Sequence, residues 1–262
     1  MRRYLALFGL FARNSLQVAL EYRADFVVSL FQSSFWLLWG IVGTLVFFRF
    51  TGTLGGWTLP QALLVVGLFR IFEGVIDGVM RPNITRIVEY IQKGTLDFVL
   101  LKPVDSQFMA SLRQLNLMTV PDFLVGFALI AYGLWLQRLL PSAQAVVTFA
   151  LLMACGLVIA YSLWMLLTTT AFWLVRVENI AEVLTAVYET GRFPVSAFGT
   201  ALRILLTFVV PIAFMTTFPA AALLGTLEPL YLGLAPLMAA ALLLASRGFW
   251  RFALRSYTSA SS

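Results

Sequence analysis

Four charged residues stand at helical spacing inside an otherwise apolar stretch of the chain. Arg70, Glu73, Asp77 and Arg81 follow one another by three and four residues, so a helix would carry them as one stripe of two positive and two negative charges. Insertion of a charged side chain at the centre of a membrane helix costs about 2.5–3.5 kcal/mol of free energy. We therefore expect these side chains to pair with one another and to face protein or water.

Two interpretations of this stripe stay open. In the first, it lines a translocation path or contacts a partner helix. In the second, its helix begins earlier, near Leu54, so that Glu73 and Asp77 only pair among the lipid head groups. A further alternative is an ion- or proton-coupled carrier or channel, in which Glu73 and Asp77 would handle the ion or proton.

The side chains needed for most catalytic and metal chemistry are missing. The chain has no histidine and one cysteine, Cys155, which excludes imidazole catalysis, Cys/His zinc sites and an intrachain disulfide. No glycine loop followed by lysine could cradle a phosphate. We expect no catalytic residue, no metal site and no cofactor bound by this chain, so it is not predicted to be an enzyme.

The composition predicts an all-α integral membrane protein. Of 262 residues, 61% are hydrophobic and 11% charged, whereas soluble domains carry about 25% charged residues. The net charge of +6 is expected to meet anionic lipid head groups, not nucleic acid.

Hydrophobic segments divide residues 1–262 into a single transmembrane domain with six predicted spans. These spans are about 26–48, 60–80, 115–136, 144–174, 201–218 and 229–246. Residues 1–23 read as an interfacial helix, and residues 81–113 as a cytoplasmic loop. The segment that follows Arg176 predicts an amphipathic surface helix closed by Gly191.

The distribution of basic residues sets the orientation. With the N-terminus inside, fifteen Lys and Arg residues, Arg176, Arg192 and Arg203 among them, fall on the inner side, and only Arg49 and Arg138 fall outside. Both termini are therefore predicted to be cytoplasmic.

The loop after the second span combines a short helix with an unusual apolar run. Pro82 suits the first turn of a helix of about 83–93, Lys93 suits its last turn, and Gly94 suits its cap. The apolar run that follows consists of Leu96, Phe98, Val99, Leu100, Leu101 and Val104. Such side chains either fold back under the bilayer or form a docking surface for a cytoplasmic protein.

Two motifs resemble a known family. Residues 94–104, GTLDFVLLKPV, resemble the G-x-L-D-x-x-L-x-K-P signature of bacterial ABC-2 type permeases, in their six-span subgroup. Residues 191–195, GRFPV, together with VPIAF at 210–214 and FPA at 218–220, resemble the pattern near the fifth span of that subgroup.

The resemblance implies a permease subunit of an ATP-binding cassette transporter in the bacterial inner membrane, most often an exporter. Its implied partners are two copies of a separate ATPase, which binds ATP and Mg²⁺, and a second permease, identical or homologous. Residues 1–23 would be the family's connecting helix, and about 219–227 its re-entrant segment. The implied ATPase-coupling residues are Glu89, Lys93, Gly94, Leu96, Asp97, Leu101, Lys102 and Pro103.

Overall fold

A computed structural model describes residues 2–21, 23–174 and 177–257, which form helices joined by short loops. The longer helices are α1 (Arg2–Glu21), α2 (Arg23–Phe50), α3 (Leu59–Val75), α4 (Arg81–Gln92), α7 (Val120–Leu136), α8 (Ala143–Thr169), α9 (Val177–Glu189) and α12 (Pro229–Ala253). The short helices are α5 (Asp97–Leu100), α6 (Ser106–Ser111), α10 (Thr200–Ile204) and α11 (Thr217–Leu223).

Tighter and wider turns extend or join these helices. The 3₁₀ turns are η2 (Leu117–Thr119), η3 (Thr170–Phe172), η4 (Thr190–Arg192), η5 (Val195–Ala197), η7 (Ile212–Phe214) and η8 (Leu254–Ser256). The π turns are η1 (Ile76–Met80) and η6 (Leu205–Val209). In the described part of the chain the only β pairing is an isolated bridge between Leu54 and Trp57, so the all-α prediction is confirmed.

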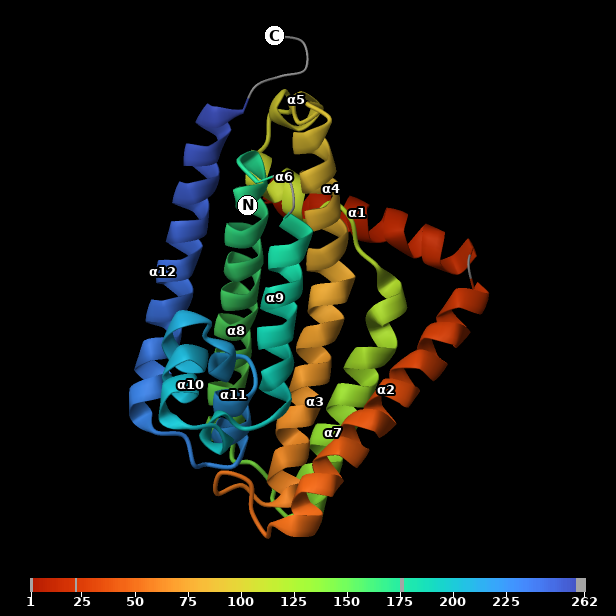
Figure 1. The fold of residues 1–262 in the computed structure, drawn as a ribbon. Coiled ribbons are helices and arrows are strands. Elements are labelled where there is room, and N and C mark those ends of the chain that lie inside the picture. Colours follow the sequence, from red (N-terminus) through yellow and green to blue (C-terminus); the bar gives the residue numbers. More distant parts are fainter. Residues whose placement is uncertain (1, 22, 175–176, 258–262) are drawn as a thin grey trace.

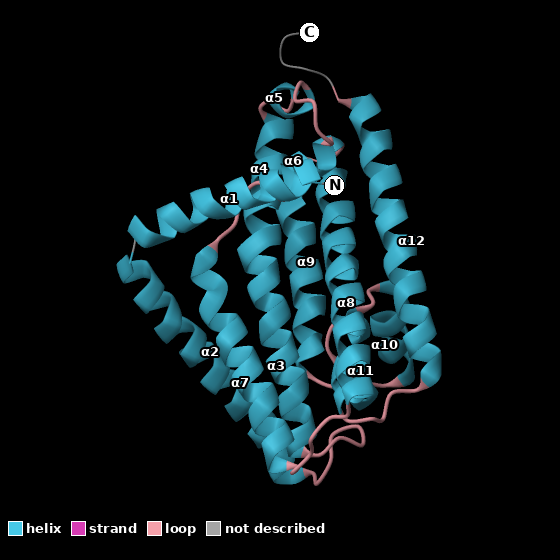
Figure 2. Cartoon of the chain, turned by 180° about the vertical axis from the view of Figure 1, so that it is seen from behind, coloured by secondary structure: helices cyan, strands magenta, loops and turns pink. Residues whose placement is uncertain are grey.

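The helices form an elongated bundle. In Figure 1, α3, α7, α8, α9 and α12 run along one long axis, α2 leans away from the bundle toward one end, and α1 crosses that end. Figure 2 shows the same arrangement from behind, with α5 and α6 at one end of the bundle. We call this the α5 end, and the opposite end, which holds loop 51–58, the far end.

Among the described residues, four helices are long and apolar enough to cross a membrane: Ala24–Phe50, Leu117–Leu136, Ala143–Phe172 and Pro229–Ser256. They coincide with the first, third, fourth and sixth predicted spans. The second predicted span, 60–80, is formed by α3 and η1, and α3 alone has 17 residues.

Helix α3 is the centre of the bundle, with residues 62–72 all buried. It packs closely on α7 because glycines face each other: a Cβ on Gly67 would lie 2.7 Å from the carbonyl oxygen of Gly126, and a Cβ on Gly126 equally close to that of Gly67. Small residues of this kind let helix backbones approach in membrane proteins.

The fifth predicted span, 201–218, is not one straight helix. Thr200–Val209 and Ile212–Leu223 meet the length and apolarity criteria only together, and they are bent by 70°. Pro211 lies at the break, where it has no N–H for a helical bond. All seven residues of α11 are buried, so the second half of the segment lies inside the bundle.

The segment before it also differs from the expectation of a surface helix. Leu184 of α9 packs against a small core that contains Val88 of α4, and further along Tyr188 is buried and its hydroxyl donates to the Phe69 carbonyl at 2.9 Å. After α9, the Ser196 hydroxyl donates to the Gly55 carbonyl in loop 51–58 at 2.7 Å. The chain therefore passes from the level of α4 to the far end. Arg176 and the side chains of 177–181 and 183 lie outside the described residues.

Candidate functional site

The predicted charge stripe is divided between two environments. Arg70 is 7% exposed, and its guanidinium pairs through Nη1 with Glu73 and through Nη2 with Asp122 of α7. Asp77 and Arg81 pair with each other at 2.9 Å and are much more exposed. Arg70 and Glu73 therefore form an inner half of the stripe, which is bound to a second helix. Asp77 and Arg81 form an outer half, whose two residues pair with each other along the chain.

A third helix joins the inner half. The Ser33 hydroxyl of α2 donates to Asp122 Oδ1 at 2.6 Å. We call Ser33, Arg70, Glu73 and Asp122 the buried cluster. It holds one guanidinium and two carboxylates, and it links α2, α3 and α7 in a region where an unpaired charge would be costly.

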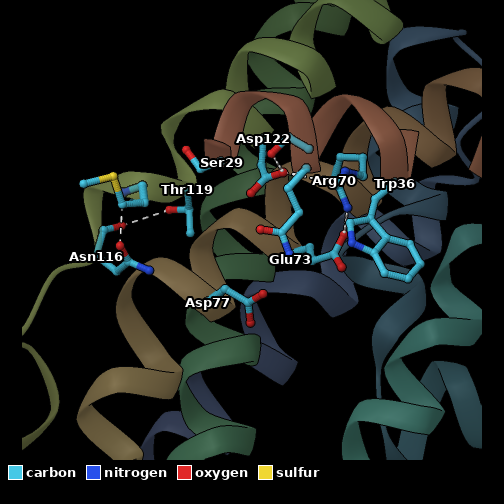
Figure 3. Close-up of a pocket in the computed structure, with 11 residues that line it drawn as sticks. Ser29, Trp36, Arg70, Glu73, Asp77, Asn116, Thr119 and Asp122 are labelled. Atoms are coloured by element: carbon cyan, nitrogen blue, oxygen red, sulfur yellow. Dashed lines mark hydrogen bonds and ion pairs between the residues drawn. The ribbon is translucent and has the colours of Figure 1, made fainter. Parts of the chain in front are cut away.

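A cavity of about 240 Å³ opens beside the buried cluster. In Figure 3, Arg70, Glu73 and Asp122 lie between Trp36 on one side and Asn116 and Thr119 on the other. The lining is largely polar, and its residues are Ser29, Gln32, Ser33, Trp36, Arg70, Glu73, Asp77, Asn116, Met118, Thr119 and Asp122. A polar cavity of this size is suited to hold water.

Arg81 points instead toward a second groove, between α4 and α9. This groove has a volume of about 630 Å³, and its polar lining includes Glu89, Glu182 and Glu189. Asp77, in the π turn η1, lines the first cavity, so the Asp77–Arg81 pair lies between the two spaces.

Asp122 is not among the residues predicted from the sequence, although a signal for it is present. This carboxylate follows Pro121 inside the third predicted span, and an acidic residue within a span is the same signal that singled out Glu73. What the sequence lacks is the pairing: Arg70 and Asp122 are 52 positions apart, and only the packing of α3 on α7 brings them together.

The second candidate site begins at the end of α4. The helix ends near Lys93, and Gly94 has φ +64°, a conformation that favours glycine. Glu89 accepts from Lys93 at 2.5 Å and from Arg86 at 3.2 Å. Hydrogen bonding from Lys93 lowers the pKa of Glu89. Both Glu89 and Lys93 are therefore engaged with neighbours on α4.

The apolar run after Gly94 points in two directions. Leu96 and Val99 are buried in a core with Ile87, Met109 and Trp250. Phe98 and Leu101 are 72% and 81% exposed at the tip of the bundle. The run therefore serves partly as core and partly as an exposed apolar surface, while Lys102 and Pro103 are exposed beside it.

The structure does not bring the two sites together. The buried cluster lies among α2, α3 and α7, whereas residues 93–108 lie at the α5 end. They are joined through the helical path α3–η1–α4. Among the described residues, no group of three or more His, Cys, Asp or Glu side chains is placed to hold a metal ion.

Comparison with known protein families gives a match over most of the chain. A family model described as "ABC-2 family transporter protein" matches residues 35–261. No curated protein and no solved structure gives a significant match.

Proposed function

The chain belongs to the ABC-2 family of transporter proteins, and from that premise we propose that it is the permease subunit of an ATP-binding cassette exporter driven by a separate ATPase. The family assignment and the apolar helices make it a multi-pass membrane protein. ATP and Mg²⁺ would be held by the ATPase, in two copies, and a second permease, identical or homologous, would complete the membrane part.

The proposed docking site is inferred from one observation. Phe98 and Leu101 are exposed, whereas Leu96 and Val99 of the same loop are buried in the core. Helix α5, which carries Phe98, lies at the tip of the bundle (Figure 1). Exposed apolar side chains at a protein surface mark interaction sites, and aromatic residues often dominate the binding energy. We assign Phe98 and Leu101 as the anchors for the ATPase, with Asp97, Lys102 and Pro103 around them. Glu89 and Lys93, which pair with each other, would orient the loop.

The course of the chain supports six crossings with a changed fifth one. We assign the crossings to α2, α3 with η1, α7, α8, α9 with η4, and α12. Residues 200–223 would then form a broken, re-entrant unit at the far end. Arg192 and Arg203 move to the outer side, which leaves thirteen basic residues inside and four outside. The positive-inside bias, and with it cytoplasmic termini in the bacterial inner membrane, is retained.

The polar cavity and the stripe suit a path between two permeases. Asp77 and Arg81 are half-exposed where η1 continues into α4, and a charged pair is better accommodated by water or a partner than by lipid. The alternative is a coupled carrier or channel, in which Glu73 and Asp77 would act without an ATPase. Dependence of activity on ATP separates the two.

A pull-down with a matched pair of leucine substitutions tests the docking proposal. Leu101 and Leu140 are both exposed, at 81% and 93%, but Leu140 lies in the loop between α7 and α8 at the far end. We expect Leu101→Asp to abolish co-purification with the partner ATPase, and Leu140→Asp to leave it unchanged. Equal co-purification of both variants would contradict docking at the α5 end, and co-purification of no ATPase with the unchanged chain would contradict the function itself.

A further inference from the structure

Residues 93–108, which we call the docking loop, are fastened to α12. Arg247 makes a two-pronged contact with Asp105, in which Nη1 donates to Oδ1 at 3.1 Å and Nη2 pairs with Oδ2. The indole Nε1 of Trp250, one turn further, donates to the Ser106 hydroxyl at 3.1 Å. Two-pronged arginine–carboxylate pairs fix orientation as well as distance.

Tyr257, just past α12, reaches the other side of the loop. The backbone N–H of Leu96 donates to the Tyr257 hydroxyl at 3.1 Å. The ring of Tyr257 packs edge-on against Phe172, which also packs edge-on against Trp250. The hydroxyl is therefore held in place directly before α5, the helix that carries Phe98.

The N-terminal helix contributes a further contact. The backbone N–H of Asp105 donates to the Tyr4 hydroxyl of α1 at 3.3 Å, and the Tyr4 ring lies 4.9 Å from that of Phe108. Asp105 also caps α6, because its Oδ1 accepts from the Phe108 N–H at 3.0 Å. One residue of the loop thus contacts α1, α6 and α12.

The loop is joined to the membrane helices covalently at both ends and also through side chains. Its N-terminal side continues through α4 into α3 and passes the π turn η1, and π turns are frequent at functional sites. Its C-terminal side continues through α6 toward α7. A side-chain connection runs from the loop through Arg247, Trp250 and Tyr257 into α12, a helix of 25 residues that reaches the far end.

We propose that Arg247, Trp250 and Tyr257, with Tyr4 of α1 holding the same loop, form a chain-end clamp through which movement of the docked ATPase reaches α12 directly. The clamp rests on the proposed function, because it needs an ATPase at the docking loop. Tyr257 and Arg247 are positioning residues in this scheme: they touch the loop and not the ATPase surface formed by Phe98 and Leu101.

The test measures the labelling rate of a thiol on α12, at the end of the helix remote from the clamp. In a Cys155→Ala background, Leu230→Cys places one thiol at the start of α12, where the native side chain is 62% exposed. The permease is purified with its ATPase, and the rate of labelling by a maleimide is measured with and without ATP and vanadate.

The clamp variants are Tyr257→Phe, which removes only the hydroxyl, and Arg247→Gln. The matched control is Arg255→Gln, an exposed arginine for which the described residues provide no ion pair.

We expect ATP and vanadate to change the labelling rate about fivefold or more in the unchanged chain and in Arg255→Gln, in line with coupling between distant sites. Tyr257→Phe and Arg247→Gln should keep ATPase co-purification and lose most of that change. Full nucleotide response in both clamp variants, or no response in the unchanged complex, would overturn the clamp while leaving the docking proposal intact. Absence of a co-purifying ATPase would overturn both.

Discussion

Arg70 on α3 forms an ion pair with Asp122 on α7, between two helices whose glycines bring the backbones into close approach. Both side chains are largely buried, and Glu73 shares the same guanidinium. Arg70 is therefore the one cation of the buried cluster, and the two carboxylates depend on it.

This charge balance predicts that Arg70 and Asp122 differ in how well they tolerate neutralisation. Arg70→Gln would leave Glu73 and Asp122 without the guanidinium that pairs with both, and breaking a buried pair in this way costs about 3–5 kcal/mol of folding stability. Asp122→Asn would leave the Arg70–Glu73 ion pair, whose net charge is zero, and should therefore reduce the folding stability much less. Thermal unfolding of the purified permease measures both, with Asp25→Asn, at an exposed acid of α2, as control. Unchanged stability of Arg70→Gln would favour a role of the stripe in a transport path over a structural role.

The contact between α3 and α7 predicts a second asymmetry, between two glycines. A Cβ on Gly126 would lie 2.6 Å from Ile71 Cγ1 and 2.7 Å from the Gly67 carbonyl, whereas a Cβ on Gly43 of α2 meets nothing within 4 Å. Gly126→Ala should destabilise the permease by about 1–3 kcal/mol through overpacking. Gly43→Ala should be neutral or slightly stabilising, since alanine favours a helix. Comparable melting temperatures for both variants would contradict the close helix contact.

The pair of Asp105 and Arg247 predicts a dependence of stability on pH. Hydrogen bonding from Arg247 lowers the pKa of Asp105 from its ordinary value of 3.8. A lowered pKa in the folded state adds stability that is fully present above the ordinary value and is lost as the pH falls through the folded value. The melting temperatures of the unchanged chain and of Asp105→Asn should therefore differ at pH 7 and begin to converge only as the pH falls below 3.8. A difference that stays constant over this range would show that the Asp105 charge adds no stability.

The course of α9 predicts which side of the membrane its end reaches. In the Cys155→Ala background, Ser196→Cys and Leu140→Cys should both react with a membrane-impermeant maleimide on intact spheroplasts, because both positions lie at the far end. Leu101→Cys, in a permease expressed without its ATPase, should react only after permeabilisation. If Ser196→Cys behaves like Leu101→Cys, α9 does not cross the membrane.

Local properties of the sequence determined much of this protein. Hydropathy and helical periodicity are set by residues within a few turns of one another, so they predict the all-α fold and segments such as α2, α7, α8 and α12 directly. The spacing of Arg70 and Glu73 likewise predicts their pairing, and the GTLDFVLLKPV motif resembles the family that the match over residues 35–261 then shows.

Only the tertiary structure decided which distant residues meet. Asp122 joins Arg70 because α3 packs on α7, and Tyr257 reaches the docking loop because α12 ends beside it. The apolar run 96–104 divides into buried Leu96 and exposed Phe98 because the core beneath it accepts one side of the loop and leaves the other uncovered. The amphipathic pattern predicted that α9 is a helix, but it did not predict that α9 inserts into the core. Periodicity indicates which face of a helix is apolar and does not indicate what covers that face.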